Sequence, residues 1–235
     1  MTRRKPARKG FVIAIDGPAG VGKSTIGTLV AKELGYRFIN TGEMYRALTW
    51  KALEDGVDTR DADAVTRLAN RLRWEFKTNE DGVIIRTVID GQPVTHQIRD
   101  ERVGMNSSLV AGVPGVRRKL RALQRGLGEQ GAIVMEGRDI TTVVFPDADF
   151  KIYLDASIEE RARRRTKQLR AAGKTADLEK IRESIIQRDM QDLQRRINPL
   201  RQAEDADVID STSLTMLEVA GRILARIRER ERGAA

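Results

Sequence analysis

Short apolar runs, separated by polar or glycine-containing segments, recur along the whole chain. Five of these runs predict buried strands, at residues 11–15, 37–39, 132–135, 150–154 and 206–210. Between the runs, apolar residues fall at helical spacing, as in Ile26, Leu29, Val30 and Leu34, which form a helix face that Gly35 should end. This alternation predicts an α/β fold in which a five-stranded parallel sheet is flanked by helices.

The alternation is interrupted between residues 60 and 105. A helix is expected at residues 61–72, and the β-branched and aromatic residues from 74 to 94 are then punctuated by turn sequences at 79–82 and 90–91. Such punctuation is typical of antiparallel hairpins. We therefore expect a small α/β unit with antiparallel strands to be inserted into the parallel sheet domain.

Helical spacing returns after the inserted unit. Residues 110–127 carry it first, and Pro114 should break or restart that helix because proline lacks a backbone N–H. Residues 157–202 form a second helical stretch, which Ser157 opens and Gly173 interrupts, and residues 214–231 form the last. The second stretch is rich in cations, which are Arg161, Arg163, Arg164, Arg165, Lys167, Arg170, Lys174, Arg188, Arg195, Arg196 and Arg201.

The first predicted strand leads into a glycine-rich segment. Residues 17–24 fit the pattern G-x-x-x-x-G-K-[ST], and they lie between a strand and a helix, as a phosphate-binding loop does. In such a loop the backbone N–H groups face phosphate oxygens, the lysine reaches the β- and γ-phosphates, and the serine hydroxyl ligates Mg²⁺. The pattern predicts a P-loop NTPase fold that binds ATP and Mg²⁺. The expected nucleotide-binding residues are Gly17, Pro18, Ala19, Gly20, Val21, Gly22, Lys23, Ser24 and Thr25, with Ser24 as the metal ligand.

Polar side chains stand at the end of every predicted strand of the parallel sheet. In open parallel sheets, ligands bind beyond the carboxyl ends of the strands. We therefore expect one crevice to collect Asp16, Thr41, Glu136, Asp155 and Asp210.

Composition narrows the classes of function. The 235-residue chain has no cysteine and one histidine, so a disulfide framework, a thiolate metal site and a histidine metal cluster are excluded. The sequence shows no apolar run of the ~18–20 residues that a membrane span requires. We expect a cytoplasmic protein with no membrane partner, and a solvated basic tail over residues 1–9.

The formal net charge of +9 admits two interpretations. It is typical of nucleic-acid binding, but arginines that hold small polyanionic substrates raise the charge as well. Aromatic residues make up only 4% of the chain, which leaves few platforms for stacking bases. We therefore expect no nucleic-acid partner and interpret residues 157–202 as an arginine-rich lid over a phosphoryl-transfer site.

Within that lid, three charged residues recur at positions i, i+4 and i+7. Arg188, Asp192 and Arg195 should then share one helix face, with one acid between two bases. An exposed ladder of surface ion pairs is the alternative interpretation of the same spacing.

Four motifs occur in order along the chain. Residues 16–23 match Asp-Gly-Pro-x-Gly-x-Gly-Lys, residues 41–46 match Ser/Thr-Gly-x-x-Tyr-Arg, and residues 188–195 match Arg-Asp-x-x-Asp-x-x-Arg. Residues 137–148 match Gly-Arg-Asp-Ile-Gly-Thr-Val-Val-x-Pro-Asp-Ala, except that Thr141 stands where the pattern has glycine. In this order the motifs resemble those of the bacterial cytidylate kinase family. The resemblance covers nearly the whole chain, but it does not specify the backbone conformation at Thr141.

The resemblance implies a nucleoside monophosphate kinase that transfers the γ-phosphoryl group of ATP to CMP or dCMP. It implies that the CMP phosphate is held by Arg46, Arg138 and Arg195, with Tyr45 lining the pocket. It places Arg188 and Asp192 at the ribose, and it surrounds the cytosine with Thr41, Ser108, Arg117 and Asp139. For Ser108 and Arg117 there is an alternative to a role in binding cytosine, which is that they are ordinary exposed polar residues of a helix. The residues expected to act in catalysis are Lys23, Arg138, Arg188 and Arg195.

The interpretation as a P-loop kinase with an inserted unit and a lid divides the chain into four parts. These are a basic tail at 1–9, a P-loop core at 10–59, 106–156 and 203–235, an inserted NMP-binding unit at 60–105, and the lid at 157–202. We expect a monomer.

Two alternatives keep the phosphate loop but change the function. A P-loop kinase for AMP, dTMP or a hydroxy acid should lack both the hairpin insertion and the spacing of the Arg188, Asp192 and Arg195 triplet. A P-loop ATPase or GTPase switch module would hydrolyse its nucleotide without a monophosphate acceptor. No Asn-Lys-x-Asp guanine signature follows the loop, which disfavours a GTPase.

Overall fold

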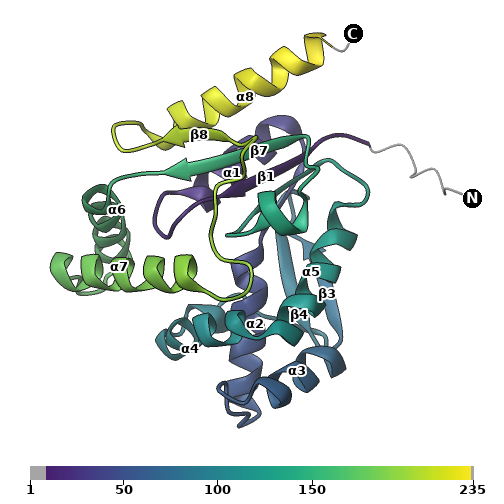
Figure 1. Ribbon diagram of the computed structural model, residues 1–235, viewed down its shortest axis with the longest axis vertical. Coiled ribbons are helices and arrows are strands. Elements are labelled where there is room, and N and C mark those ends of the chain that lie inside the picture. The colour runs from purple at the N-terminus through teal and green to yellow at the C-terminus, as the bar shows by residue number, and fades with distance from the viewer. Residues whose placement is uncertain (1–8, 234–235) are drawn as a thin grey trace, which may run out of the picture.

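The computed structural model describes residues 9–233 and is centred on a parallel sheet (Figure 1). Nearly all of the predicted basic tail therefore lies outside the described residues. The five-stranded sheet has the order β2-β6-β1-β7-β8, and every neighbouring pair is parallel. Its strands are β1 (Val12–Asp16), β2 (Arg37–Asn40), β6 (Ile133–Glu136), β7 (Phe150–Asp155) and β8 (Asp207–Asp210). All five predicted strands are confirmed within one residue at each end.

Helices cover both faces of the sheet and thereby bury its central strand, β1, on both sides. On one face, Ile13 and Ile15 pack with residues of α1 (Lys23–Leu34) and α8 (Met216–Gly233). On the other face, Val12 and Ala14 join a second apolar cluster. That cluster includes residues of α2 (Thr41–Glu54), α3 (Ala62–Arg71), α4 (Glu101–Gly112) and α5 (Pro114–Gly128). The alternation of side chains along β1 thus divides the core into two layers.

Glycine and proline end and start the helices where the sequence predicts. Gly35 closes α1 with a φ of 65°, a left-handed conformation that glycine adopts without the steric cost of a side chain. Pro114 is the first residue of α5, and Val113 separates it from the end of α4. Proline suits this position because the backbone N–H groups of the first helical turn have no partner within the helix, so the missing N–H of proline costs no hydrogen bond.

A second, antiparallel sheet confirms the predicted insertion. It consists of β3 (Trp74–Thr78), β4 (Ile85–Ile89) and β5 (Gln92–Pro93), followed by a short 3-10 helix, η1 (Gln97–Arg99). Ile85, Ile89 and Val94 belong to the same apolar cluster as α2. The Phe38 amide also donates to Val83 O at 2.8 Å, which joins the insertion to the edge of the parallel sheet. The inserted unit therefore shares its core with the sheet domain.

Two helices form the arginine-rich segment. They are α6 (Ile158–Ala171) and α7 (Leu178–Gln194), which pack against each other beside the sheet and above α4 (Figure 1). Ser157 caps α6 by accepting from the Glu160 amide, and Gly173 turns the chain between the helices with a φ of 71°. Both features agree with the sequence prediction.

One detail of this segment was predicted wrongly. Arg195 lies just beyond the last residue of α7, with extended backbone angles, so it does not continue the helix face of Arg188 and Asp192. Its guanidinium instead donates to the carbonyl oxygens of Ile197 and Asn198 in the following turn. These local bonds favour the end of the helix at Gln194.

Across residues 9–233, no helix is both long enough and apolar enough to cross a membrane.

Candidate active site

The loop between β1 and α1 has the tight curl that a phosphate cradle requires. Gly17, Gly20 and Gly22 have φ angles of 147°, 84° and 97°, which strongly favour glycine. A Cβ at Gly17 would lie 2.1 Å from the carbonyl oxygen of Leu154, so β7 also forbids a side chain there. The loop then ends in the N-terminus of α1, whose unpaired N–H groups favour an anion.

Lys23 is held inside this loop. Its Nζ donates to Gly17 O at 2.8 Å and to Pro18 O at 2.7 Å, and only 6% of the residue is exposed. Burial lowers the pKa of Lys23 to about 7, and the nearby positive charge of Arg138 adds to the effect. The ammonium is therefore positioned by carbonyl oxygens of the loop, next to the cluster that carries Arg138.

A buried carboxylate accompanies the serine of the loop. Ser24 Oγ donates to Glu136 Oε1, and Asn40 Nδ2 donates to Ser24 Oγ at 3.2 Å. Burial raises the pKa of Glu136, while Lys23 opposes that rise. Residues 9–233 contain no group of three or more His, Cys, Asp or Glu that could hold a metal ion alone. A hydroxyl and one carboxylate suit Mg²⁺, which takes its remaining ligands from phosphate oxygens and water.

The lid helices reach the tip of the loop. Arg161 Nη1 donates both to Ala19 O at 3.1 Å and to Asp189 Oδ2, and the Ala19 amide donates to Asp189 Oδ1 at 3.3 Å. Arg161 comes from α6 and Asp189 from α7, so both helices meet at one loop residue. These contacts were not predicted, and their only sequence signal is that both residues lie in the charged lid.

A carboxylate bridges the turn after β6 to the lid. Arg138 Nε donates to Asp192 Oδ2 at 2.7 Å, and Arg195 Nη1 lies 3.6 Å from Asp192 Oδ1. Burial acts to raise the pKa of Asp192, but Arg138 and Arg188 hold it below its usual value. Asp192 is therefore an anion that holds Arg138 and Arg195 together, whereas the spacing in the sequence predicted that it lies between Arg188 and Arg195.

Arg188 carries a buried charge on which the carboxylate of Asp192 acts without a direct ion pair. Burial lowers its pKa to about 10, and the positive charges of Arg138 and Arg46 contribute further. Over residues 9–233, no hydrogen bond or ion pair joins its guanidinium to another residue. Within the described part of the chain, the Arg46 side chain donates one hydrogen bond, to Ile98 O, and burial together with the charge of Arg165 lowers the pKa of Arg46. We call Arg46, Arg138, Arg188 and Arg195 the arginine cluster. Among residues 9–233, Asp192 is the only carboxylate that contacts two members of this cluster, so the cluster is suited to bind an anion.

A second ion pair lies beside the arginine cluster. Arg117 Nη1 donates to Asp139 Oδ2 at 2.9 Å, and Nε of the same arginine donates to Ala111 O at 2.6 Å. The guanidinium also lies over the ring of Tyr45, at 5.4 Å from its centroid. Both side chains of the pair are less than one-tenth exposed. Arg117 is therefore not an exposed helix residue. Because it donates to Oδ2 of Asp139, its hydrogen bond does not occupy Oδ1 of that carboxylate.

Two other predicted base contacts lie differently. Thr41 Oγ1 donates to Glu136 O at 2.7 Å, so its proton is already used and only its lone pairs are available to a ligand. Ser108 is half-buried on α4, and no hydrogen bond within residues 9–233 joins it to Asp139 or Arg117.

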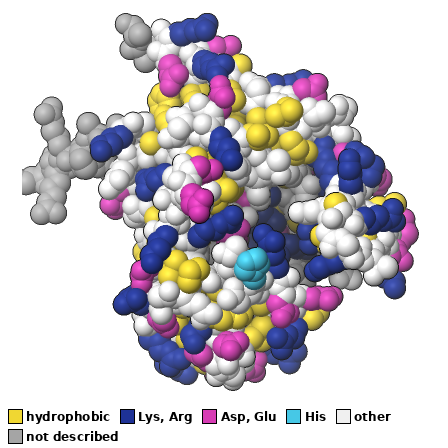
Figure 2. All heavy atoms as spheres, turned by 180° about the vertical axis from the view of Figure 1, so that it is seen from behind, with side chains coloured by type: hydrophobic (Ala, Val, Ile, Leu, Met, Phe, Trp, Pro, Cys, Tyr) yellow, Lys and Arg dark blue, Asp and Glu magenta, His cyan; other side chains and the backbone are white. Residues whose placement is uncertain are grey.

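The surface is hollowed on the face that is seen from behind the view of Figure 1. Figure 2 shows dark-blue Lys and Arg side chains around this hollow, beside the single cyan histidine.

The strand ends are less uniform than predicted. Asp16 and Glu136 are buried beside the loop. Asp155 and Asp210 are exposed, and they accept hydrogen bonds from the amides of Ala156 and Thr212 respectively.

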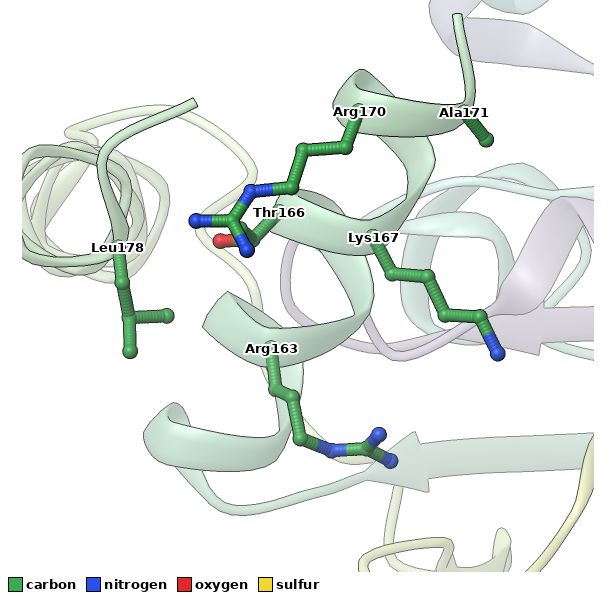
Figure 3. A pocket seen from close by; sticks show the side chains of 6 residues that line it. All are labelled: Arg163, Thr166, Lys167, Arg170, Ala171 and Leu178. Carbon is green, nitrogen blue, oxygen red and sulfur yellow. The ribbon is translucent and has the colours of Figure 1, made fainter. Parts of the chain in front are cut away.

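A separate cavity of about 430 Å³ lies on the lid (Figure 3). It is lined by Arg163, Thr166, Lys167, Arg170, Ala171 and Leu178. None of the predicted site residues lines this cavity, so it is not the candidate active site.

Comparison with known proteins gives a consistent result. The family described as "Cytidylate kinase" matches residues 13–229. The cytidylate kinase of Geobacillus thermodenitrificans is 49% identical, over 93% of this chain and 96% of its own. That of Pelotomaculum thermopropionicum is 48% identical, over 92% of this chain and 95% of its own.

Two further matches place the fold. A bifunctional pantoate ligase/cytidylate kinase of Gloeobacter violaceus is 42% identical, and the match covers 95% of this chain but 44% of that protein. Among solved structures, an uncharacterized protein from Eubacterium ventriosum aligns with a TM-score of 0.54 at 12% identity, over 94% of this chain and 99% of its own. The latter similarity supports the fold alone.

Proposed function

The chain belongs to the cytidylate kinase family, and from this premise we propose how it transfers the γ-phosphoryl group of ATP to CMP or dCMP. The products are CDP and dCDP, and the chain is an enzyme of pyrimidine nucleotide metabolism. The observation that carries the proposal is the uncompensated arginine cluster next to the phosphate loop. A switch module that only hydrolyses ATP would have no use for a second anion site there.

The donor side of the proposal rests on the loop. Residues 17–25 cradle the ATP phosphates with their N–H groups, and Lys23 turns from the carbonyl oxygens of the loop to the β- and γ-phosphates. Ser24 would hold Mg²⁺, with Glu136 beside it, and the ion would supply positive charge to neutralise the phosphate oxygens. Glu136 adds to the single metal ligand that the sequence predicts.

The acceptor side of the proposal rests on the arginine cluster. Arg46, Arg138 and Arg195 hold the phosphate of CMP, which supplies the negative charge that the cluster lacks. Arg188 and Asp192 reach the ribose. Arg188 extends to the transferred group, because no hydrogen bond or ion pair within residues 9–233 holds its guanidinium elsewhere. Tyr45 lines this pocket under Arg117.

The base side of the proposal rests on hydrogen-bond polarity. Cytosine offers an N4 amino donor beside the N3 and O2 acceptors. Asp139 accepts from N4 through the oxygen that Arg117 does not occupy, and Arg117 donates to the acceptors. Thr41 and Ser108 complete the surroundings of the base.

Catalysis in this arrangement is positioning and charge stabilisation. Closure of α6 and α7 brings donor and acceptor phosphates into line and excludes water, while Lys23, Arg138, Arg188 and Arg195 stabilise the charge that spreads over the transferred group. The reaction needs no covalent intermediate and no strong general base.

The proposal requires one copy of the chain, since loop, inserted unit and lid all come from it. We therefore propose a monomer that acts on cytoplasmic nucleotides, without a nucleic-acid or membrane partner. Its parts are the core (10–59, 106–156 and 203–235), the NMP-binding unit (60–105) and the lid (157–202).

An assay of ADP release over a panel of acceptors tests this function. CMP and dCMP should be phosphorylated much faster than AMP, GMP or dTMP, because the Arg117–Asp139 pair matches cytosine. ADP release that is independent of any acceptor supports the switch alternative. Robust AMP phosphorylation with inert CMP contradicts the proposal.

A further inference from the structure

The turn that carries Arg138 and Asp139 is anchored on both sides by consecutive residues of β1. Before the pair, the Gly137 amide donates to Ile15 O at 3.0 Å. After the pair, the Ile140 amide donates to Asp16 Oδ1 at 3.0 Å. The two side chains proposed to meet CMP therefore sit on a short bridge between two points of the strand that leads into the phosphate loop.

The second anchor has an additional bond from a side chain. Both the amide and the hydroxyl of Thr141 donate to Asp16 Oδ2, each at 2.7 Å. Asp16 is fully buried and Thr141 is 1% exposed, so water cannot replace these donors. Burial raises the pKa of Asp16 to about 6, and the Thr141 donors oppose that rise.

The hydroxyl is the part of this anchor that threonine contributes. The glycine of the matching motif would supply the same amide but no hydroxyl. The backbone of Thr141 is not left-handed, so the position does not need glycine. Within residues 9–233, the Thr141 hydroxyl is the only side-chain donor to Asp16.

The same turn fixes the backbone of Asp139. Residues Ile140–Val144 form a π-helical turn, in which Asp139 O accepts from the amides of Val143 at 3.0 Å and Val144 at 3.1 Å. A shift of Thr141 within this turn therefore moves Asp139, and with it the buried contact to Arg117.

We propose that Thr141 is a positioning residue for phosphoryl transfer, whose hydroxyl ties the Arg138–Asp139 turn to Asp16 and so fixes the CMP site relative to the phosphate loop. The inference rests on the proposed function, because it assigns the turn to CMP. It predicts that loss of the hydroxyl impairs the use of CMP and leaves the use of ATP nearly unchanged.

The neighbouring residue supplies a matched control. Thr142 has a buried Oγ1 without a hydrogen-bond partner among the described residues. Thr141→Val and Thr142→Val make the same chemical change at adjacent positions, but only the first removes a bond. Thr141→Ser keeps the hydroxyl and should rescue the effect of Thr141→Val.

Steady-state kinetics with CMP and with ATP as the varied substrate give the first readout. Thr141→Val should lower kcat/KM for CMP about tenfold, since a hydrogen bond to a charged group is lost, and change KM for ATP by less than about twofold. Thr141→Ser and Thr142→Val should stay within about threefold of wild type. An unchanged kcat/KM for CMP in Thr141→Val overturns the proposal, as does an equal loss in Thr142→Val.

Amide hydrogen exchange without substrate gives a second readout, which a failure of the proposed function does not affect. The amides of Ile140 and Thr141 should exchange at least about tenfold faster in Thr141→Val than in wild type, and wild-type rates there contradict the anchor. If Thr141→Val does not fold, Thr141→Ala and Thr141→Gly replace it with the same expectations. A wild-type chain that does not phosphorylate CMP refutes the proposed function instead.

Discussion

The phosphate loop and the arginine cluster lie next to each other but recruit their binding groups from different parts of the chain. The loop uses contiguous residues, 17–25, whose backbone is shaped by glycine and whose lysine is held by carbonyl oxygens of the same loop. The cluster uses side chains from α2, from the turn after β6, and from α7 and the residue that follows it. Asp192 holds two of them, Arg138 and Arg195. The donor site is thus fixed by local backbone geometry, and the acceptor site by long-range charge pairing.

The largest expected effect tests the donor side of this comparison. Lys23→Met removes a cation whose contact with the β- and γ-phosphates strengthens as charge develops, so kcat should fall by about 10²–10³-fold. The melting temperature should change little, because burial already disfavours the charge of Lys23. Turnover and thermal unfolding are the measurements.

Lys32 on the same helix provides the control for that variant. It is about half-exposed and its Nζ lies 3.4 Å from Asp81 Oδ2, so Lys32→Met should keep wild-type turnover. Equal losses in the two lysine variants would show that the charge of α1, rather than the loop contact, matters.

The acceptor side should respond to Arg188 in a different way. Arg188→Ala removes an unpaired guanidinium, so KM for CMP should rise by about 10- to 100-fold while KM for ATP changes by less than about threefold. Arg182 lies on the same helix, is 40% exposed, and has its nearest acidic oxygen at 3.8 Å, so Arg182→Ala is the control. If Arg188→Ala leaves both KM for CMP and kcat unchanged, the surface ion-pair interpretation of α7 holds.

Base choice should change more modestly. Uracil presents an O4 acceptor where cytosine has a donor, so Asp139 should disfavour UMP by ~1–3 kcal/mol for each unsatisfied group, about a five- to hundredfold penalty. Asp139→Asn places an amide there and should narrow the ratio of the specificity constants for CMP and UMP by about fivefold, mainly through lost CMP activity. The ratio cancels general loss of stability. An unchanged ratio, with both substrates reduced equally, would show that Asp139 acts elsewhere.

The last prediction concerns stability rather than turnover. Asp16 lies between the two regions, and its titration should make the free energy of unfolding depend on pH. Burial raises the pKa of Asp16 in the folded state to about 6, above the ordinary value of 3.8, so the folded state favours the protonated carboxyl. Its contribution to the free energy of unfolding is therefore full below pH 4 and is lost as pH rises through 6, by about 2–3 kcal/mol. Urea unfolding of wild type and Asp16→Asn between pH 4 and 8 should show this change in their difference. A difference that is constant with pH contradicts it.

The same contrast explains what the sequence could predict. The strands, the loop and the antiparallel insertion follow from local patterns, and the structure confirms them. The ends of the apolar runs also place Asp16 and Glu136 at the crevice. The pairing of Ser24 with Glu136, 112 positions away, and of Ala19 with Asp189, 170 positions away, depends on tertiary packing that no local pattern contains.

Arg195 shows the opposite limit of prediction. Its spacing from Arg188 and Asp192 suits a helix, but hydrogen bonds to the next turn end the helix one residue earlier. The Arg195 side chain still lies near Asp192, although not on the helix face that the spacing predicted, and no hydrogen bond or ion pair within residues 9–233 joins Arg188 to Asp192.

Titration of the wild-type chain with CMP and with cytidine, each without ATP, tests the central claim most directly. The two ligands share base and ribose, so their affinity ratio isolates what the arginine cluster contributes to binding a phosphate. We expect CMP to bind at least about a hundredfold more tightly, as charge-assisted bonds to a buried anion require. Equal affinities for CMP and cytidine would contradict the assignment of the arginine cluster to the acceptor phosphate.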